Sequence, residues 1–234
     1  LNVMALPSNP QFGNYAEAFI RGKMGVYFFN SVFNSIVTVM LVVVVAGITG
    51  YVLSRYRFRG RNLVYIFFLS GMVFPIYALL IPIFIQFKTL GLHNARYTLL
   101  LPYLAFRLPV AIFLIDSFVQ GIPTDMEEAA YIDGSTIGGT LFRVILPMCR
   151  PAMATVVILS FLDTWNEFPL ALVLLSSDKF KTLPVGLTNF SSQYTTDYPQ
   201  LLAALAITAL PVILLYLFFS KAIIQGVISG AVKG

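Results

Sequence analysis

The sequence predicts an all-α integral membrane protein, a polytopic helical bundle, and its composition and long apolar runs support this class. Hydrophobic residues make up 58% of the 234 residues, only 11% are charged, and the mean hydropathy is +0.84. A soluble domain carries roughly 25% charged residues, so this chain has too few charges to cover a surface in water. Because lipid cannot hydrogen-bond the backbone, each long apolar run is expected to be a helix.

Counts of individual residue types exclude several kinds of site. One cysteine and one histidine exclude a disulfide framework and a metal site built from Cys or His clusters. The net charge of +5 does not indicate nucleic-acid binding, because the basic residues stand at the ends of apolar runs, where they mark topology.

The chain begins with a polar segment, and the first membrane span follows it. Residues 1–29 are expected to be an extracytoplasmic segment with at most a short amphipathic helix at Asn14–Phe19. The first span is Asn30–Leu53, in which Gly47 and Gly50 offer a small face for close helix packing. Four arginines follow in Arg55–Arg61, and the positive-inside rule places them in the cytoplasm.

Four further spans are expected, giving five within a transmembrane domain of residues 30–219. The second contains Pro75 and Pro82, which should kink it. The fourth begins near Pro151, meets a polar stretch after residue 162 and resumes to residue 175. Residues 176–200 form a long outer loop, and residues 220–234 form a cytoplasmic tail with turn-prone glycines. The second, third and fifth spans are Leu63–Phe87, Thr98–Phe118 and Leu201–Phe219.

Residues 122–147, named here the cytoplasmic loop, separate two apolar runs but carry four carboxylates. Thr124 and Glu127 have the spacing of a capping box, which predicts a short helix to about Asp133. Gly134 can take positive φ and end that helix. Ser135 is then expected to cap a second helix, residues 136–146, that Pro147 ends.

The spacing within this loop resembles the EAA loop of ABC importer permeases. Glu128, Ala129 and Ala130 are followed after three residues by Gly134, and after nine more by Val144, one residue and then Leu146-Pro147. The family usually has Ile where Val144 stands. Stretches near residues 30, 51, 91 and 165 and the final AVKG resemble maltose-type carbohydrate permeases, so the resemblance covers nearly the whole chain.

This resemblance implies a type I importer that moves a sugar or oligosaccharide across a bacterial or archaeal cytoplasmic membrane. The family has six spans, so the first one is expected to be missing from this sequence. The implied partners are a second permease, two ATPase subunits that bind ATP and Mg, and an extracytoplasmic solute-binding protein, while this chain binds no cofactor. The implied coupling residues on the ATPase side are Glu128, Ala129, Ala130, Gly134, Leu146 and Pro147. The tail is expected to reach the ATPase, and the outer loop to contact the binding protein.

Polar residues inside the spans are candidates for a translocation pathway, because polar groups in a membrane are costly and usually face the bundle interior. An indole beside amides and carboxylates suits the apolar faces and polar edges of a sugar. The alternative is structural: Arg107 pairs with a carboxylate and the Asn stripe bonds between helices. Tyr51, Tyr77 and Tyr103 are interpreted as interface residues. The pathway candidates are Asn30, Asn34, Thr38, Arg107, Asp163, Trp165, Asn166 and Glu167.

Other functions remain alternatives. An ABC permease for an amino acid, peptide or sugar phosphate would share the loop, whereas a secondary transporter would not need it. An intramembrane enzyme would need a nucleophile or metal constellation, and neither HExxH nor GxSxG occurs. The chain also has no GxxxxGK[ST] phosphate-binding motif of its own.

Overall fold

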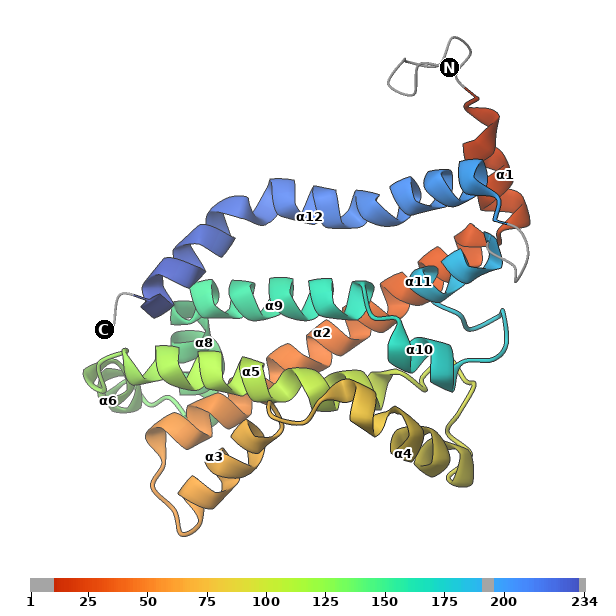
Figure 1. The fold of residues 1–234 in the computed structure, drawn as a ribbon. Coiled ribbons are helices and arrows are strands. Elements are labelled where there is room, and N and C mark those ends of the chain that lie inside the picture. The colour runs from red at the N-terminus through yellow and green to blue at the C-terminus, as the bar shows by residue number, and fades with distance from the viewer. Residues whose placement is uncertain (1–10, 191–195, 232–234) are drawn as a thin grey trace.

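The computed structural model describes residues 11–190 and 196–231, and among them the regular structure is helical with no β-strand. This confirms the predicted class. Four long helices pack on one another along the molecule, with α2 crossing obliquely and α12 at one edge (Figure 1). The four helices are α2 (Met24–Arg55), α5 (Leu100–Gln120), α9 (Arg150–Trp165) and α12 (Tyr198–Ala231). The most extensive contacts are between α2 and α5, α2 and α9, and α9 and α12.

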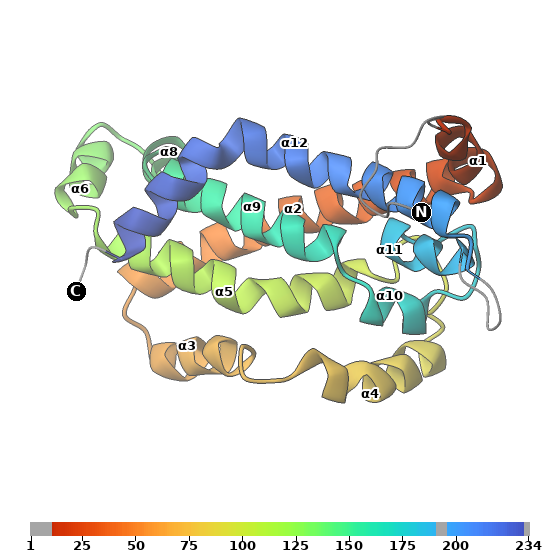
Figure 2. The ribbon, with the colours of Figure 1, turned by 45° about the horizontal axis from the view of Figure 1, so that its top comes forward.

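Short helices gather at the two ends of this bundle. α1, α10 and α11 lie at one end, and α6 and α8 lie at the other, as both Figure 1 and Figure 2 show. The first group is α1 (Gly13–Arg21), α10 (Pro169–Leu174), α11 (Leu183–Gly186) and the 3-10 helix η2 (Leu187–Phe190). The second is α6 (Asp125–Ile132), α7 (Ile137–Thr140), the π-helix η1 (Leu141–Ile145) and α8 (Leu146–Met148).

Three of the described helices, α2, α5 and α12, are long and apolar enough to cross a membrane. They coincide with the first, third and fifth predicted spans. A fourth crossing exists only if Ile137–Met148 and Arg150–Trp165, which are bent by 78°, count as one. The expected total of five spans therefore stays a prediction.

The predicted second span is divided into α3 (Arg61–Ser70) and α4 (Ile76–Thr89). The break falls before Pro75, whose ring disfavours helical geometry in the preceding residue. Pro82, in contrast, stays inside α4, so the expected kink at this position does not divide the helix. Figure 2 shows α3 and α4 as a separate row along one side of the bundle. Gly71 allows the end of α3 to approach α5, because a Cβ there would lie 2.9 Å from Cγ of Pro109.

Close packing of α2 depends on its glycines, as the sequence predicted. A Cβ added to Gly50 would lie 2.8 Å from Cγ2 of Ile115 on α5, and one added to Gly47 would lie 3.3 Å from Cδ2 of Leu146. Removing the side chain lets neighbouring backbones come together, which is how small residues favour association of membrane helices. The buried apolar core around this contact includes Val42, Ala46, Ile112, Ile115 and Ile145.

The two ends of the chain differ in how they match the prediction. The short helix expected at Asn14–Phe19 is present as α1. The tail is different, because α12 continues through residue 231 without a break at the glycines expected to form turns. A helix that continues an apolar span retains its backbone hydrogen bonds, which outweighs the modest cost of about 1 kcal/mol for each internal glycine. Residues 1–10, 191–195 and 232–234 lie outside the described parts.

Candidate functional site

The cytoplasmic loop leaves the bundle as α6 and returns through α7, η1 and α8. Gly134 follows α6 with φ of +82°, which confirms the positive φ expected there. A Cβ at this position would meet no atom of the chain within 4 Å. A side chain at Gly134 would therefore cost backbone strain and occupy open space on the surface of the loop.

The predicted capping box at the start of α6 is wrong. Thr124 is the N-cap, but its side chain makes no capping hydrogen bond, and its helical backbone does not present the hydroxyl to the free amides. Glu127 does not reach back to Thr124. Its side chain turns towards α2 and is buried, with the residue only 7% exposed.

Glu127 accepts hydrogen bonds from two side chains of α2. The Tyr51 hydroxyl donates to Oε2 at 3.0 Å, and Nε of Arg55 donates to Oε1 as part of an ion pair. Nη2 of Arg55 also donates to the carbonyl oxygen of Ile122 at 2.7 Å. Both side chains of the ion pair are largely buried, at 12% and 10% exposed. Tyr51 is therefore a buried donor, and its interpretation as an interface residue is wrong.

The sequence contains two signals for this buried network. Tyr51 and Arg55 are four residues apart, so they share one face of α2. Arg55 also belongs to the basic segment that marks topology, and Glu127 also has the spacing of a capping residue. A carboxylate in the loop that can reach a basic and a phenolic donor on one helix face favours a charge-assisted buried pair.

The second half of the loop also differs from the prediction. Thr136, rather than Ser135, caps α7, because its hydroxyl accepts from the amide of Gly139 at 3.2 Å. Helix η1 then widens to a π-helix, in which the amide of Leu146 donates to the carbonyl of Leu141, five residues back. Pro147 does not end the helix but lies within α8. Since proline lacks an N–H and clashes with the carbonyl four residues back, a wider turn before it relieves the clash.

The expected coupling residues lie on different sides of this loop. Glu128, Ala129 and Gly134 are exposed, so they face away from the bundle, while Ala130 is half-buried. Leu146 is also half-buried and packs on α2 beside Gly47. The loop therefore presents an acid and a small residue outward and holds its returning helix against the bundle.

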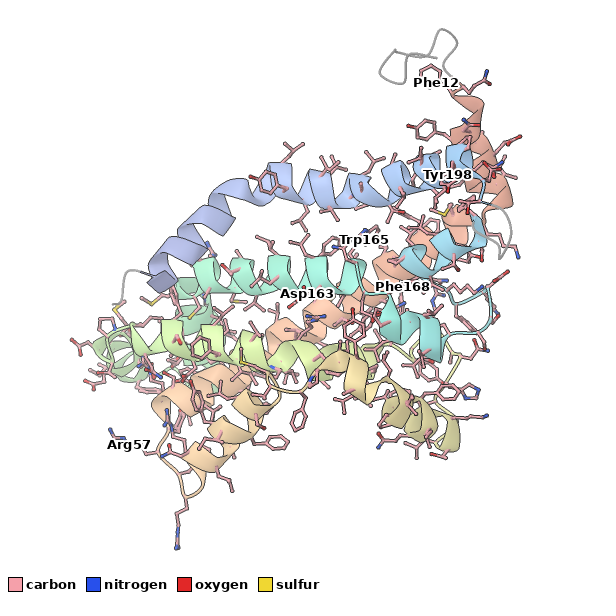
Figure 3. The ribbon with its side chains drawn as sticks, viewed as in Figure 1. Phe12, Arg57, Asp163, Trp165, Phe168 and Tyr198 are labelled. Atoms are coloured by element: carbon pink, nitrogen blue, oxygen red, sulfur yellow. The ribbon has the colours of Figure 1, made fainter. Side chains whose placement is uncertain are left out.

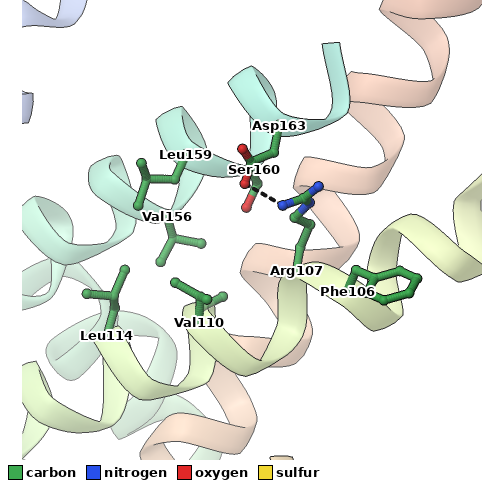
Figure 4. A pocket seen from close by; sticks show the side chains of 9 residues that line it. Phe106, Arg107, Val110, Leu114, Val156, Leu159, Ser160 and Asp163 are labelled. Carbon is green, nitrogen blue, oxygen red and sulfur yellow. Dashed lines mark hydrogen bonds and ion pairs between the residues drawn. The ribbon is translucent and has the colours of Figure 1, made fainter. Parts of the chain in front are cut away.

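A second polar group lies between α5 and α9 near the middle of the bundle. Nη1 of Arg107 and Oδ2 of Asp163 form an ion pair at 2.5 Å (Figure 4), with the side chains 24% and 51% exposed. The pair borders a small cavity of about 30 Å³, which Phe106 and Ser160 also line. The structural alternative for Arg107, pairing with a carboxylate, is thus observed, but the pair remains accessible from the cavity.

The other residues after Asp163 have internal partners. Trp165 is 1% exposed, stacks on Phe161 with ring centroids 5.5 Å apart, and donates from Nε1 to the carbonyl of Thr208 at 3.1 Å. Asn166 donates to the carbonyl of Leu162 at 2.8 Å. These contacts place the Trp165 indole in the core, close to the end of α9 (Figure 3).

Glu167 is a buried capping residue for α10. Its Oε1 accepts from the amide of Leu170 at 2.6 Å, and its Oε2 accepts from the amide of Ala171 at 3.1 Å. The Tyr103 hydroxyl donates to Oε2 at 2.6 Å. Tyr103 is therefore buried, and the expectation of an interface position for it is wrong, whereas Tyr77 is 73% exposed.

The polar stripe on α2 fastens the outer loop. The amide of Asn30 donates to the carbonyls of Lys179 and Lys181, at 2.9 Å each, and the hydroxyl of Ser31 accepts from the amide of Leu183 at 2.8 Å. Asn34 donates to the carbonyl of Asn30 at 2.8 Å, and Thr38 is fully buried. Oδ1 of Asn34 and Oγ1 of Thr38 have no partner within the described parts of the chain.

Charged residues add to this attachment at the outer end. Asp178 accepts from Lys181 at 2.7 Å and from Lys23, just before α2, at 2.9 Å. Hydrogen bonds from Lys181 and Lys23 lower the pKa of Asp178 from 3.8 to about 2. The carboxylate is therefore charged at any physiological pH. It links the outer loop to Lys23, while its pair with Lys181 stays within the loop.

Within the described chain, no group of three or more His, Cys, Asp or Glu residues could hold a metal ion. The two polar groups described above contain ion pairs and hydrogen bonds, without a nucleophile paired to a base. The molecule thus has the exposed cytoplasmic loop at one end and the outer loop, attached to α2, at the other. Between α5 and α9 lies the accessible Arg107–Asp163 ion pair.

Comparison with known proteins gives one family. Residues 42–229 match the model for "Binding-protein-dependent transport system inner membrane component". The diacetylchitobiose uptake system permease protein NgcG of Streptomyces coelicolor is 38% identical over 231 residues, which cover 98% of this chain and 76% of that protein. The arabinooligosaccharides transport system permease protein AraQ of Bacillus subtilis is 35% identical over 237 residues, covering 100% and 83% of the two chains.

A solved structure has the same fold. It is a bacterial ABC transporter involved in the import of the acidic polysaccharide alginate, with a TM-score of 0.83 and 25% sequence identity. The match covers 94% of this chain and 82% of the other.

Proposed function

The chain belongs to the family of binding-protein-dependent transport system inner membrane components, and we propose that it is the permease subunit of an ATP-driven importer of oligosaccharides. The family is one of membrane transport subunits that work with other ABC components, not of enzymes. The proposal adds the specific partners: a second permease, two ATPase subunits on the side of the cytoplasmic loop, and a solute-binding protein on the other side. It also places the chain in the cytoplasmic membrane of a prokaryote.

The observation that carries this proposal is the cytoplasmic loop. It stands at the end of the bundle, turns at Gly134 with positive φ, and exposes Glu128 and Ala129. A small residue beside an acid allows close approach of a partner and offers one charge for it to pair. We propose that the ATPase docks here and supplies the energy, since the chain has no nucleotide-binding motif.

An oligosaccharide is favoured by the group around Arg107 and by the relatives. The Arg107–Asp163 pair and Ser160 supply polar partners, and Phe106 supplies an apolar face for a sugar ring. The cavity of about 30 Å³ is far below the roughly 300–1,000 Å³ of complete small-molecule sites. We therefore propose that the second permease forms the other wall. The similar permeases serve diacetylchitobiose and arabinooligosaccharides.

The test is reconstitution of the chain in liposomes with the second permease, the ATPase and the binding protein encoded beside it. Uptake of labelled oligosaccharides is expected to require both ATP and the binding protein. An ATPase whose nucleotide-binding lysine is replaced serves as the control and should abolish uptake. Uptake driven by an ion gradient without ATP would instead show a secondary transporter, and uptake of amino acids, peptides or sugar phosphates in place of oligosaccharides would reject the sugar.

A further inference from the structure

We propose that Arg55, Glu127 and Tyr51 form a clamp that fastens the first helix of the cytoplasmic loop to α2, so that movement of α6 is passed directly to α2. This inference rests on the proposed function, because it assigns how the loop transmits the action of the ATPase. The three residues act as positioning residues for coupling and need not contact the solute or the ATPase.

The geometry of the clamp fixes an orientation as well as a distance. Arg55 holds two points of the loop at once, the carboxylate of Glu127 on α6 and the carbonyl of Ile122 before it. Tyr51, one turn earlier on α2, holds the second oxygen of the same carboxylate. A single hydrogen bond would leave α6 free to pivot, whereas a planar guanidinium with two acceptors resists rotation.

Burial makes the clamp persistent. The Arg55 and Glu127 side chains are only 12% and 10% exposed, so water cannot readily replace either partner. Separating a buried pair leaves an uncompensated charge, which is strongly unfavourable. The two helices should therefore move together when a force acts on the loop.

The clamp joins α6 to α2 through side chains. The close backbone contacts of α6 are chiefly with η1 and α7, in the same loop, and not with the long helices. Beyond the clamp, the end of α2 is secured by Nε of Arg61, which donates to the carbonyl of Leu53 at 2.6 Å. The Tyr51 ring packs edge-on against Tyr56, with ring centroids 5.9 Å apart. Movement of α6 is therefore transmitted to an end of α2 that these contacts hold in place.

Two adjacent acids consequently have different tasks. Glu127 faces inward to α2, and Glu128 faces outward, where the ATPase is proposed to dock. Replacing Glu128 should release the ATPase, whereas replacing Glu127 should leave the ATPase bound and lose the transmission of its motion. This difference makes the clamp testable.

The experiment compares Glu127→Gln and Arg55→Gln with the wild-type chain in the reconstituted transporter. It measures the amount of ATPase that co-purifies with the permeases and the solute transported for each ATP hydrolysed. We expect unchanged ATPase retention and a fall of about tenfold in solute per ATP, within the range typical of coupling between sites. Asp125→Asn and Arg57→Gln are the matched controls, since both residues are exposed neighbours, and they should behave as wild type.

Two results would overturn the clamp. One is a wild-type ratio of solute to ATP in Glu127→Gln, and the other is loss of the ATPase from that variant, which would assign Glu127 to docking. If a single variant does not fold, Arg55→Gln/Glu127→Gln decides by the same measurements, because it leaves no unpaired buried charge. Failure of the wild-type complex to show ATP-dependent uptake would reject the proposed function itself, whatever the variants do.

Discussion

Glu127 and Glu128 are neighbours in the cytoplasmic loop, but one is buried and the other is exposed. They are therefore expected to contribute differently to the stability of the loop and to partner binding. Glu127 is 7% exposed and paired, while Glu128 beside it is exposed. An exposed ion pair within one chain contributes only about 0–1 kcal/mol, so Glu128 has little value for the fold of the loop. Its contribution is expected to arise when a partner buries it.

A substitution at Gly134 tests whether a partner approaches this turn closely. Gly134→Asp should cost about 1 kcal/mol for the left-handed backbone, since no atom of the chain obstructs the new side chain. An unpaired carboxylate buried against the ATPase would cost roughly 3–5 kcal/mol, or more than a hundredfold in association. We expect the variant to insert and to pair with the second permease, but to lose the ATPase and transport.

Co-purification of ATPase with tagged permease measures this effect. Gly138→Ala is the matched control, because Gly138 lies in the same loop with open space around it but without positive φ. It should retain the ATPase. Wild-type retention in Gly134→Asp would mean that the partner does not approach this turn.

At the scale of elements, the π-helix sets how the loop joins the bundle. Helix η1 and Pro147 precede the 78° bend between Ile137–Met148 and α9. An α-helix advances by about 100° for each residue, so one extra residue in a turn rotates everything before it by about that angle. The direction in which α6 faces therefore depends on this wide turn.

Pro147→Ala tests that dependence. Alanine restores an N–H and removes the clash with the carbonyl of Arg143, which allows η1 to rewind as α-helix. We expect thermal stability equal to or above that of the wild-type permease, together with a loss of transport of about tenfold or more, because the loop would face a different direction. Pro151→Ala, at the start of α9, is the control. If η1 is shown to be α-helical in Pro147→Ala and transport is still normal, the π-helix is not needed for coupling.

How far the sequence predicts these elements depends on the range of the interactions involved. The length of the apolar runs predicts α2, α5 and α12. The backbone preferences of glycine and proline predict the turn at Gly134 and the break at Pro75. Local pattern failed where a distant partner competed. The spacing of Thr124 and Glu127 matches a capping box, but Arg55, 72 positions away, offers Glu127 a charged and buried partner.

The candidate site shows the same limit. The sequence identified polar residues in apolar surroundings, yet it could not distinguish an accessible pair from an internal hydrogen bond. Arg107 and Asp163 border a cavity, while Trp165 and Glu167 are occupied by the backbone of α12 and α10. Burial depends on which helices pack together, and apolar spans of similar composition do not specify that by themselves.

At the scale of the whole molecule, Asn30 ties the outer loop to the bundle. Its amide supplies hydrogen bonds to two carbonyls of that loop, and each lost bond to a buried group costs about 1–3 kcal/mol. Asn30→Leu should therefore loosen the outer loop while leaving the cytoplasmic loop intact. We expect stimulation of the ATPase by solute-loaded binding protein to fall at least fivefold, with basal hydrolysis unchanged.

Stimulated and basal hydrolysis measured in liposomes check this expectation. Asn166→Leu is the control, because the Asn166 amide donates to the carbonyl of Leu162 in the preceding turn and, among the described residues, not to the outer loop. A loss of basal hydrolysis in Asn30→Leu would show that the substitution disturbs the whole bundle. Cross-linking from the exposed Thr188 is a direct test of the loop as a binding surface, because Phe190 is only 7% exposed and Tyr194 lies outside the described residues.

Helix α2 is attached at both extremes, through Asn30 to the outer loop and through Arg55 to the cytoplasmic loop. These residues lie on one unbroken helix of 32 residues, and at a rise of 1.5 Å they are about 37 Å apart. Thermodynamic linkage then makes the communication two-way. If arrival of the loaded binding protein favours closure of the ATPase by some factor, bound ATP must tighten the hold on the binding protein by that same factor. A transporter with this linkage would bind the solute-binding protein most tightly when ATP is bound and the permease is ready to receive the solute.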